Sequence, residues 1–253
     1  KFIFYKRERK NNLIIYRIWS FIAKKDNSYL NFLDYLSFGI SAFCFSMFIK
    51  CDIIVGSSPP LPVAFFSMLA AKIKKVKIVV EIRDLWVDSI SDLKISKSKI
   101  FIKLLYFFEN KLIECSDLVA CTTNSIKKKL LKKTNVKRIY VRPNGSGNLD
   151  SYRKSLKIKN LRKKNKLNML FLGTIGASQN FKILLETLEK FKNKIFMTII
   201  GNGSEFKNLE KLIEKKKLIN INLVKLNESS IKNNIYDQFD IGISSLKNNK
   251  TFK

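Results

Sequence analysis

Residues 79–90 read VVEIRDLWVDSI, and this stretch decides the fold. It begins with valine and isoleucine, the β-branched residues that fill buried strands. Charge enters at the end of the apolar run, with Glu81, Arg83 and Asp84. In an open parallel sheet, ligands bind in the crevice beyond the carboxyl ends of the strands. A charged end on a core strand therefore predicts a strand that opens into a binding crevice.

Similar apolar runs recur along the chain and alternate with helical patterns. Strands are predicted at residues 52–56, 76–82, 117–121 and 138–141, with helices at about 31–48, 61–73, 98–115 and 124–132. Continuous Val/Ile strands that alternate with helices indicate a parallel sheet covered on both faces. The predicted fold class is therefore α/β.

The composition changes after residue 150. Residues 151–167 are polar and basic, as in an interdomain linker. Strands are predicted again at 168–173, 195–201, 220–226 and 240–246, with helices that begin near residues 179, 204 and 229. We thus predict an N-terminal domain at 1–150 and a C-terminal domain at 168–253. Both are expected to be cut short, because the first has no opening strand with a glycine-rich turn and the second stops directly after a strand.

The formal net charge is +29, from 49 basic and 20 acidic residues. Such a charge would suit a nucleic acid or an anionic membrane, because it attracts polyanions. Only eight of the basic residues are arginine, however, and arginine makes the bidentate contacts with phosphates and guanines. The abundance of lysine, asparagine, isoleucine and phenylalanine indicates an A/T-rich coding sequence as the main cause of the charge.

The absence of histidine excludes Ser-His-Asp and Cys-His catalytic systems and any histidine metal site. Four cysteines lie in apolar runs without C-x-x-C spacing, so we expect reduced core residues of a cytosolic protein. They are Cys44, Cys51, Cys115 and Cys121. The apolar helix at 31–48 contains Asp34 and several serines, which favours a buried helix over a membrane span.

Two loops of the first domain follow predicted strands and have unusual content. Residues 56–62, GSSPPLP, predict a rigid turn with the free hydroxyls of Ser57 and Ser58, or else an ordinary helix start with a serine cap and proline in the first turn. After the next strand, Arg83 can hold an anion and Asp84 can bind a hydroxyl group. The alternative for this second pair is an internal ion pair that closes the end of the sheet, and the two residues alone do not decide.

Two glycine turns follow strands of the second domain, GTIG at 173–176 and GNGSE at 201–205. Glycines there let backbone N–H groups approach a phosphate near a helix N-terminus. A single G-x-G is more often only a tight turn, but two such turns are more informative.

Residues 94–112 have an amphipathic helical pattern. One face is predicted to hold Ile100, Phe101, Leu104, Leu105, Phe108 and Leu112, with Lys99, Lys103 and Asn110 opposite. Such a helix usually covers a sheet. The flanking Ile102 and Phe107, with Lys94 and Lys97 just before them, also allow a basic helix that rests on a membrane surface.

Taken together, these stretches resemble a known family. Residues 52–90 look like the first-domain core of bacterial family 4 glycosyltransferases, in the L-fucosamine-transferase-like branch that builds O-antigen and capsular sugars, where S-S-P-P-L and R-D-L-W-P-D-S segments are typical. Four further stretches resemble later parts of the family sequence: VRPNG (141–145), LFLGTIGASQNFKILLE (170–186), IIGNGSEFKNLEKL (199–212) and DIGISSLKNNKTFK (240–253). The R-D-L-W segment is fairly specific, whereas the glycine turns are not.

The resemblance implies a GT-B fold, in which two Rossmann-like domains bind the acceptor and the donor nucleotide. It implies transfer of a sugar from a nucleotide diphosphate donor to a saccharide or polyprenyl-linked acceptor, which is an EC 2.4 activity. The transfer would be retaining and would need neither a metal nor a cofactor. The pathway would be lipopolysaccharide, O-antigen or capsule synthesis. We therefore expect a cytoplasmic protein in peripheral contact with an anionic membrane at its inner face, and no nucleic-acid partner.

Site residues follow from the same resemblance. Catalytic roles are assigned to Asp84 and Arg83, without a metal ligand. The acceptor-side cleft is expected to contain Ser57, Ser58, Trp86 and Asn144. Donor binding is assigned to Gly173, Thr174, Gly176, Gln179, Lys182, Gly201 and Gly203.

The chain departs from the family pattern in several places. Thr174 and Gln179 stand where many members have an arginine and a lysine that neutralise the diphosphate, so phosphate binding is expected to rely on backbone N–H groups or Lys182. Val87 stands where the branch has proline. The N-terminal glycine loop and the downstream acidic motif are absent, so we expect a fragment that lacks both ends and is inactive by itself.

Two other classes of function remain open. A non-catalytic nucleic-acid-binding α/β module would present a contiguous basic face and bind with a steep salt dependence. A nucleotide-sugar epimerase or another Rossmann enzyme would carry G-x-G-x-x-G after its first strand and a Tyr-x-x-x-Lys pair, and neither motif is found.

Overall fold

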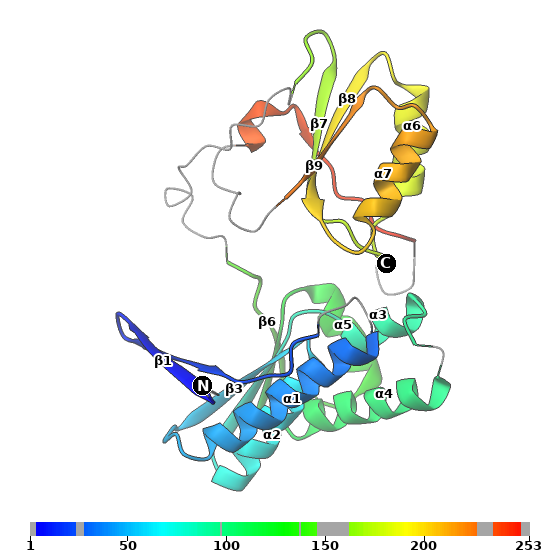
Figure 1. The fold of residues 1–253 in the computed structure, drawn as a ribbon. Helices are drawn as coiled ribbons and strands as arrows, with labels where there is room; N and C mark the ends of the chain where they lie inside the picture. Colours follow the sequence, from blue (N-terminus) through cyan, green and yellow to red (C-terminus); the bar gives the residue numbers. More distant parts are fainter. Residues whose placement is uncertain are drawn as a thin grey trace. The chain divides into compact units, whose positions relative to one another are not determined.

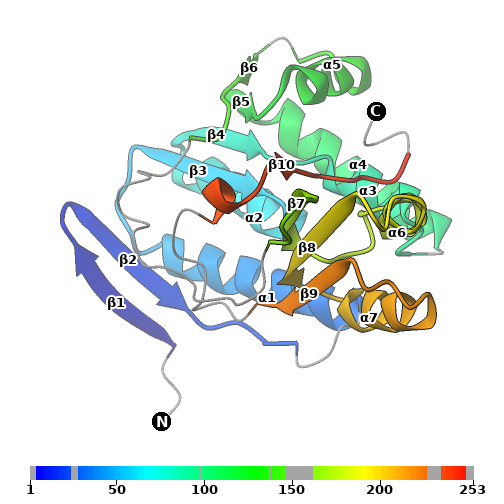
Figure 2. The same ribbon diagram turned by 90° about the horizontal axis from the view of Figure 1, so that it is seen from above.

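The chain folds into two compact units, Lys1–Gly145 and Ser146–Lys253. The computed structural model describes residues 4–23, 28–96, 98–136, 138–145, 162–226 and 235–248. Each unit contains a four-stranded parallel sheet with helices packed on it (Figure 1, Figure 2). The α/β fold class with parallel sheets is therefore confirmed.

The first sheet has the order β3-β4-β5-β6, which is also the order along the chain. Its strands are β3 (Ile53–Ser58), β4 (Lys77–Ile82), β5 (Leu118–Cys121) and β6 (Ile139–Val141). The connections contain α2 (Leu61–Lys74), α3 (Trp86–Asp92), α4 (Lys99–Glu114) and α5 (Asn124–Lys133). Side-chain caps mark two helix starts, because Ser98 accepts the Phe101 N–H and Thr123 accepts the Ile126 N–H.

Helices α2, α4 and α5 share one core with a single face of this sheet. Alternate residues of β4, such as Val80 and Ile82, are buried in that core. On the opposite face Ile53, Val55 and Tyr140 are 56%, 65% and 52% exposed. The prediction that both faces are covered is therefore wrong for the described part of this unit. Successive right-handed crossovers that run in one direction across a sheet all lie on the same face.

Residues before β3 form a hairpin and a helix. No element is predicted at residues 5–18, but they form the antiparallel pair β1 (Tyr5–Lys10) and β2 (Leu13–Ile18). The rings of Tyr5 and Tyr16 lie 4.9 and 5.0 Å from the ring of Phe45 in α1 (Ser28–Ser46), measured between centroids. These aromatic contacts join the hairpin to the helix.

Helix α1 packs along α2 but is not buried as predicted. Its side chains of Leu33, Phe38 and Ile40 are 48%, 36% and 45% exposed. No helix in the described ranges is long and apolar enough to cross a membrane. Of the four free cysteines only Cys121 is buried, and Cys44 is exposed, so the prediction of four core cysteines is also wrong. Both errors have the same cause: apolar neighbours in sequence do not guarantee a covering layer.

The second sheet has the order β10-β7-β8-β9. Its strands are β7 (Leu167–Thr174), β8 (Ile195–Asn202), β9 (Ile221–Lys225) and β10 (Ile241–Gly242). Helices α6 (Phe181–Lys190) and α7 (Phe206–Lys215) pack on one face. Ile235 and Phe239, on either side of the 3-10 helix η2 (Tyr236–Gln238), pack against Leu170 and Ile200 in a separate cluster.

Strand order in the second unit reverses beside β7. From β7 the chain moves outward to β8 and β9, and it then returns to place β10 on the other side of β7. Strand β10 is much shorter than the predicted strand at 240–246. The predicted helix near residue 229 and residues 151–161 of the predicted linker lie outside the described residues.

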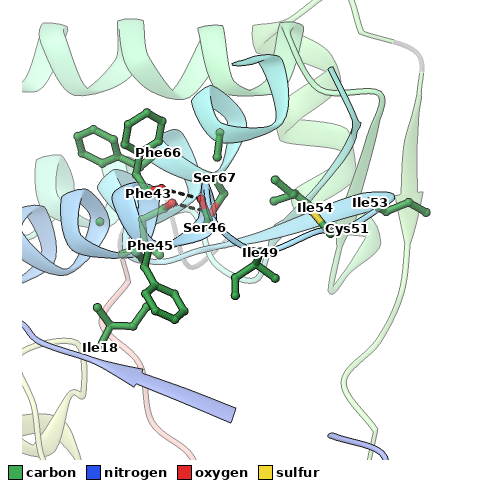
Figure 3. Close-up of a pocket in the computed structure, with 14 residues that line it drawn as sticks. Ile18, Phe43, Phe45, Ser46, Ile49, Cys51, Ile53, Ile54, Phe66 and Ser67 are labelled. Atoms are coloured by element: carbon green, nitrogen blue, oxygen red, sulfur yellow. Dashed lines mark hydrogen bonds between the residues drawn. The ribbon is translucent and has the colours of Figure 1, made fainter. Parts of the chain in front are cut away.

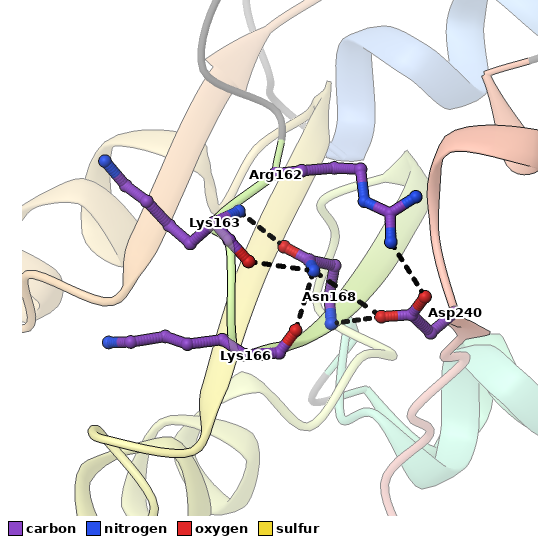
Figure 4. Close-up of polar contacts among 5 residues, drawn as sticks. All are labelled: Arg162, Lys163, Lys166, Asn168 and Asp240. Carbon is purple, nitrogen blue, oxygen red and sulfur yellow. Dashed lines mark hydrogen bonds and ion pairs between the residues drawn. The ribbon is translucent and has the colours of Figure 1, made fainter.

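Asn168, buried at the start of β7, holds the neighbouring backbone in place (Figure 4). Its side chain accepts the Lys163 N–H at 2.7 Å and donates to the Lys166 carbonyl at 2.7 Å. Its backbone N–H donates to Asp240 at 2.8 Å, which lowers the pKa of that carboxyl, and Arg162 pairs with the same carboxylate. These contacts lie at the amino end of the sheet and are structural.

Candidate functional site

The carboxyl edge of the first sheet collects the ends of its strands. Arg83 follows β4, and its N–H donates to the Ser58 carbonyl at the end of β3 at 2.8 Å. The Thr122 hydroxyl, after β5, donates to the Arg83 carbonyl at 3.1 Å. The Arg142 N–H, after β6, donates to the Cys121 carbonyl at 2.7 Å. The backbone at this edge is therefore fixed, while the side chains of Arg83 and Arg142 are exposed.

Asp84 and Arg83 point out of this edge without pairing with each other. Asp84 accepts the Leu85 N–H at 2.8 Å, and both side chains are exposed. Within the described ranges neither side chain takes part in an ion pair, so the alternative of an internal pair that closes the sheet is not supported. A guanidinium and a carboxylate are both left to meet a ligand.

The two serines before the prolines lie in a strand, not in a turn. Ser57 and Ser58 are the last residues of β3, and Ser58 is buried. The Ser57 hydroxyl donates to Glu81 on β4 at 2.9 Å. The prediction of a turn with free hydroxyls is therefore wrong, because the strand continues to the first proline and pairs fully with β4.

Trp86 and Asn144 occupy different settings. Trp86 is half-buried at the start of α3, with its ring edge-on to that of Tyr35 at 6.2 Å between centroids. This contact makes Trp86 a packing residue of α3. Asn144 is exposed three residues after the end of β6, on the same edge as Arg142. Thr122 and Arg142 were missed from the sequence, although both directly follow a strand.

The two glycine turns of the second unit pack against each other. A Cβ atom on Gly201 would lie 2.0 Å from the Gly173 carbonyl oxygen, and one on Gly203 would lie 2.4 Å from the Ile175 oxygen. Gly203 also has a φ of +153°. These glycines therefore permit a close approach of backbone to backbone, and the phosphate role predicted for them is not required to explain them.

Two N–H groups of the 173–176 turn are already bonded. The Ile175 N–H donates to the Asn202 carbonyl at 2.9 Å, and the Gly176 N–H donates to the Gln179 side-chain oxygen at 3.0 Å. Gln179 thus closes the turn, and its backbone pairs with Leu246 as an isolated bridge. Thr174, at the end of β7, is exposed. The sequence prediction of free N–H donors fails at 175 and 176.

A pocket of about 170 Å³ does gather part of the predicted donor site. Gly176, Gln179 and Lys182 line it together with Glu205 and Lys247. It lies beyond the carboxyl ends of β7 and β10, where the strand order reverses. Ligands in open α/β sheets bind at such reversals. Helix α6 begins here with N-cap Asn180 and without a side-chain cap, so its first N–H groups face this region.

A second cavity, in the first unit, has a different chemistry (Figure 3). It measures about 250 Å³ and is lined mainly by apolar residues of α1, α2 and β3, among them Phe43, Phe66 and Ile54. Among the residues that the structure describes, no acidic or basic side chain lines it, and the Ser46 and Ser67 hydroxyls donate to carbonyls of their own helices. It therefore offers nothing that would neutralise a diphosphate.

Behind the carboxyl edge, three helices of the first unit meet at one ammonium group. Lys133 at the end of α5 lies 2.7 Å from an Asp88 oxygen on α3 and 3.5 Å from Glu109 on α4. Tyr106 on α4 donates its hydroxyl to the second Asp88 oxygen at 2.7 Å. The Glu109 side chain is only 3% exposed, and one of its oxygens accepts no hydrogen bond. We name these four residues the Lys133 cluster.

Burial governs protonation in the Lys133 cluster. Desolvation raises the pKa of Glu109, and the nearby Lys133 only partly opposes this effect. The pKa of Tyr106 is raised first by burial and then by its hydrogen bond to Asp88. Tyr106 therefore stays a neutral donor, and burial favours the neutral form of Glu109 beside the same ammonium group.

The glycine contact can be tested with Gly203→Ala. The new methyl group would meet the Ile175 backbone, so we expect a loss of roughly 2 to 4 kcal/mol in the free energy of unfolding, from crowding and the positive φ. Gly242→Ala is the matched control, because a Cβ there meets nothing within 4 Å. Urea denaturation followed by circular dichroism would measure both variants, and equal stability of the two would contradict the packing role.

Glu109→Gln tests the buried carboxyl. A raised folded-state pKa means that stability is complete below the unfolded pKa of Glu109 and is lost as the pH rises through the folded pKa. Glutamine resembles the protonated form, so the variant should gain stability relative to the wild type as the pH rises above the ordinary pKa of a glutamate, about 4.3. The control Glu114→Gln removes an exposed pair with Lys111 and should show a small, flat difference. A constant loss in Glu109→Gln at every pH would reverse the conclusion.

No family model and no curated protein matches the chain. Several solved structures, however, have a similar fold. TarM of S. aureus matches with 17% identity and a TM-score of 0.52, over 79% of this chain and 38% of TarM. Anabaena HepE, solved with UDP and glucose, matches with 14% identity and a TM-score of 0.57, over 75% of this chain and 51% of HepE.

The pneumococcal O-GlcNAc transferase GtfA, solved with UDP and GlcNAc, matches with 13% identity and a TM-score of 0.53, over 94% of this chain and 49% of GtfA. This chain therefore spans about half, or less, of the chains that it matches. These neighbours are GT-B glycosyltransferases, and at such identities the likeness concerns the fold. The predicted GT-B fold class is confirmed.

Proposed function

We propose that the protein is a GT-B glycosyltransferase that moves a sugar from a nucleotide diphosphate donor to a saccharide acceptor. One observation carries the proposal: in each unit, predicted site residues lie at the carboxyl edge of a parallel sheet, in a fold shared with glycosyltransferases solved with UDP. This edge is where α/β sheets bind ligands.

The donor diphosphate is proposed to bind in the pocket beyond β7 and β10. Lys182 and Lys247 supply positive charge there, and the uncapped start of α6 supplies N–H groups. The Glu205 carboxylate in the same pocket would repel a phosphate, so we assign it to hydroxyl groups of the ribose or the sugar. Lysines and a helix dipole would then stabilise the leaving diphosphate.

The acceptor is proposed to meet the carboxyl edge of the first sheet. Asp84 is exposed there beside Arg83, so it can hold an acceptor hydroxyl while the guanidinium holds an anionic group. Arg142 and Asn144 extend this polar edge. In this proposal transfer needs no metal, since lysines and N–H groups neutralise the charge of the diphosphate. The retaining outcome is proposed from the family resemblance.

The finer assignment rests on residues 52–90. Their S-S-P-P-L and R-D-L-W segments resemble the family 4 branch that builds O-antigen and capsular sugars. We therefore propose a polyprenyl-linked or other saccharide acceptor, in lipopolysaccharide or capsule synthesis, and a cytoplasmic location.

The exposed face of helix α4 supports a peripheral membrane contact. This face includes Ile100 and Leu104, which were predicted to lie on the face that covers the sheet. Leu105 and Leu112 are buried, whereas Ile100, Leu104 and Phe107 are 81%, 48% and 54% exposed. The last three follow i, i+4, i+7 spacing and so form one outward stripe. Exposed lysines at 99, 103 and 111 accompany it. Apolar side chains among lysines suit the surface of an anionic membrane.

Donor binding and transfer by the full-length protein provide the main test, because the chain is expected to be inactive by itself. UDP- and GDP-sugars would be screened by thermal shift, where a ligand at 100 times its dissociation constant adds about 2.7 kcal/mol. Asp84→Asn and Arg83→Gln should lower transfer by about 100-fold, as is typical for lost electrostatic stabilisation or positioning, with donor binding retained. The control Arg138→Gln changes an exposed arginine at the amino end of β6 and should keep full transfer. Wild-type transfer by Asp84→Asn, or binding of DNA but of no nucleotide sugar, would defeat the proposal.

Vesicle sedimentation tests the membrane contact. The protein should sediment with vesicles that contain phosphatidylglycerol, and the double variant Leu104→Ser and Phe107→Ser should lose most of this binding. Ile183→Ser and Leu212→Ser form a matched control on α6 and α7, because these side chains are also exposed, at 58% and 41%. Equal sedimentation of both double variants would show that α4 is not the contact.

A further inference from the structure

Helix α3 cannot be held by its own local interactions. It has seven residues, its N-cap is Leu85, and no side chain caps it. Isolated helices shorter than about 12 residues are marginal in water, so tertiary contacts must hold α3. The helix begins two residues after Asp84, and any rotation of α3 therefore turns the Arg83–Asp84 segment.

Apolar burial alone leaves that rotation free to vary. Val87 and Ile90 are buried and fix the depth of α3 in the core. Hydrophobic burial is not directional, however, whereas hydrogen bonds and close ion pairs are. Asp88 supplies directional contacts from two sides, since its two oxygens bind Tyr106 of α4 and Lys133 of α5.

Two contacts, one before α5 and one at its end, connect that helix to the Arg83–Asp84 segment and to α3. Just before α5, the Thr122 hydroxyl donates to the Arg83 carbonyl. At its other end, Lys133 binds Asp88. The segment is thus tied to α5 both directly and through α3. A ring that is closed at two points resists rotation better than a single contact.

We propose that Asp88 is a positioning residue, which through Lys133 and Tyr106 sets the direction in which Arg83 and Asp84 leave strand β4. The role in transfer rests on the proposed function, whereas the mechanical role does not. Lys133 is the common partner, because its ammonium also lies 4.8 Å from the centroid of the Tyr106 ring and 3.5 Å from Glu109.

Trp86 reports on α3 directly. The chain has two tryptophans, so a Trp19→Phe background leaves Trp86, the first residue of α3, as the only one. In that background, Asp88→Asn and Lys133→Met should shift the emission of Trp86 to the red and increase its quenching by acrylamide. Lys133→Arg keeps the charge and should restore wild-type emission. The control Glu114→Gln, at an exposed pair on α4, should change neither signal.

Transfer kinetics supply the second readout. Asp88→Asn should lower kcat by about 10- to 100-fold, the cost of misplacing a reacting group, while KM for the donor stays near the wild-type value. Both signals would be normalised to the folded fraction, so that a protein that was merely destabilised would keep the wild-type kcat, KM and emission. Should Asp88→Asn not fold, Tyr106→Phe removes one hydroxyl and should give smaller changes in the same direction.

The outcomes separate the two proposals. If the full-length wild type transfers no sugar, the proposed function fails, and the emission of Trp86 still decides whether Asp88 positions α3. If Asp88→Asn keeps wild-type emission and quenching, the positioning role is wrong. A lower melting temperature with unchanged kcat and emission would also overturn it, because Asp88 would then only stabilise the fold.

Discussion

Strand β4 is hydrogen-bonded to a parallel neighbour on each side, and the first unit depends on this position. It pairs with β3 over Lys77–Ile82 and with β5 over Val79–Ile82, and its side chains decide what faces the core. Val80 and Ile82 enter the core, whereas the charged Glu81 of the same strand faces away from it and binds Ser57. Arg83 and Asp84 then stand at the edge on a backbone that Ser58 and Thr122 hold. Rigid backbone and free side chains together make this edge suitable for recognition.

Strand order explains where each unit is open. In the first unit the order follows the chain, so the helices gather on one face and leave Val55 and Tyr140 exposed on the other. In the second unit the order reverses beside β7, and a pocket with Gly176, Lys182 and Lys247 lies beyond that reversal. The same topological rule thus accounts for an uncovered sheet face and for a candidate ligand site.

Buried and half-buried polar groups in this protein fix directions that apolar packing does not determine. Asn168 orders the backbone at the amino end of β7, and Asp88 joins α3 to α4 and α5. Removing these polar groups from water costs free energy. Their hydrogen bonds compensate for it, except at Glu109 of the Lys133 cluster, where one oxygen accepts no hydrogen bond. The incomplete group is the one whose protonation responds to burial. The polar contacts therefore fix the orientation of the helices and loops, and apolar burial supplies most of the stability.

The sequence by itself determined the parallel α/β class, the strands of both sheets to within a few residues, and the place of Arg83–Asp84 at a strand end, because apolar runs and their period are local properties. It could not determine which side of α4 is buried, since that helix is apolar over much of its circumference and Ile100 and Leu104 proved to be exposed. The contact of Gly203 with Ile175, and the meeting of Asp88, Glu109 and Lys133, join residues far apart in the chain. Only the tertiary structure decides such contacts, because they depend on how strands are ordered and helices rotated, and no local pattern encodes either.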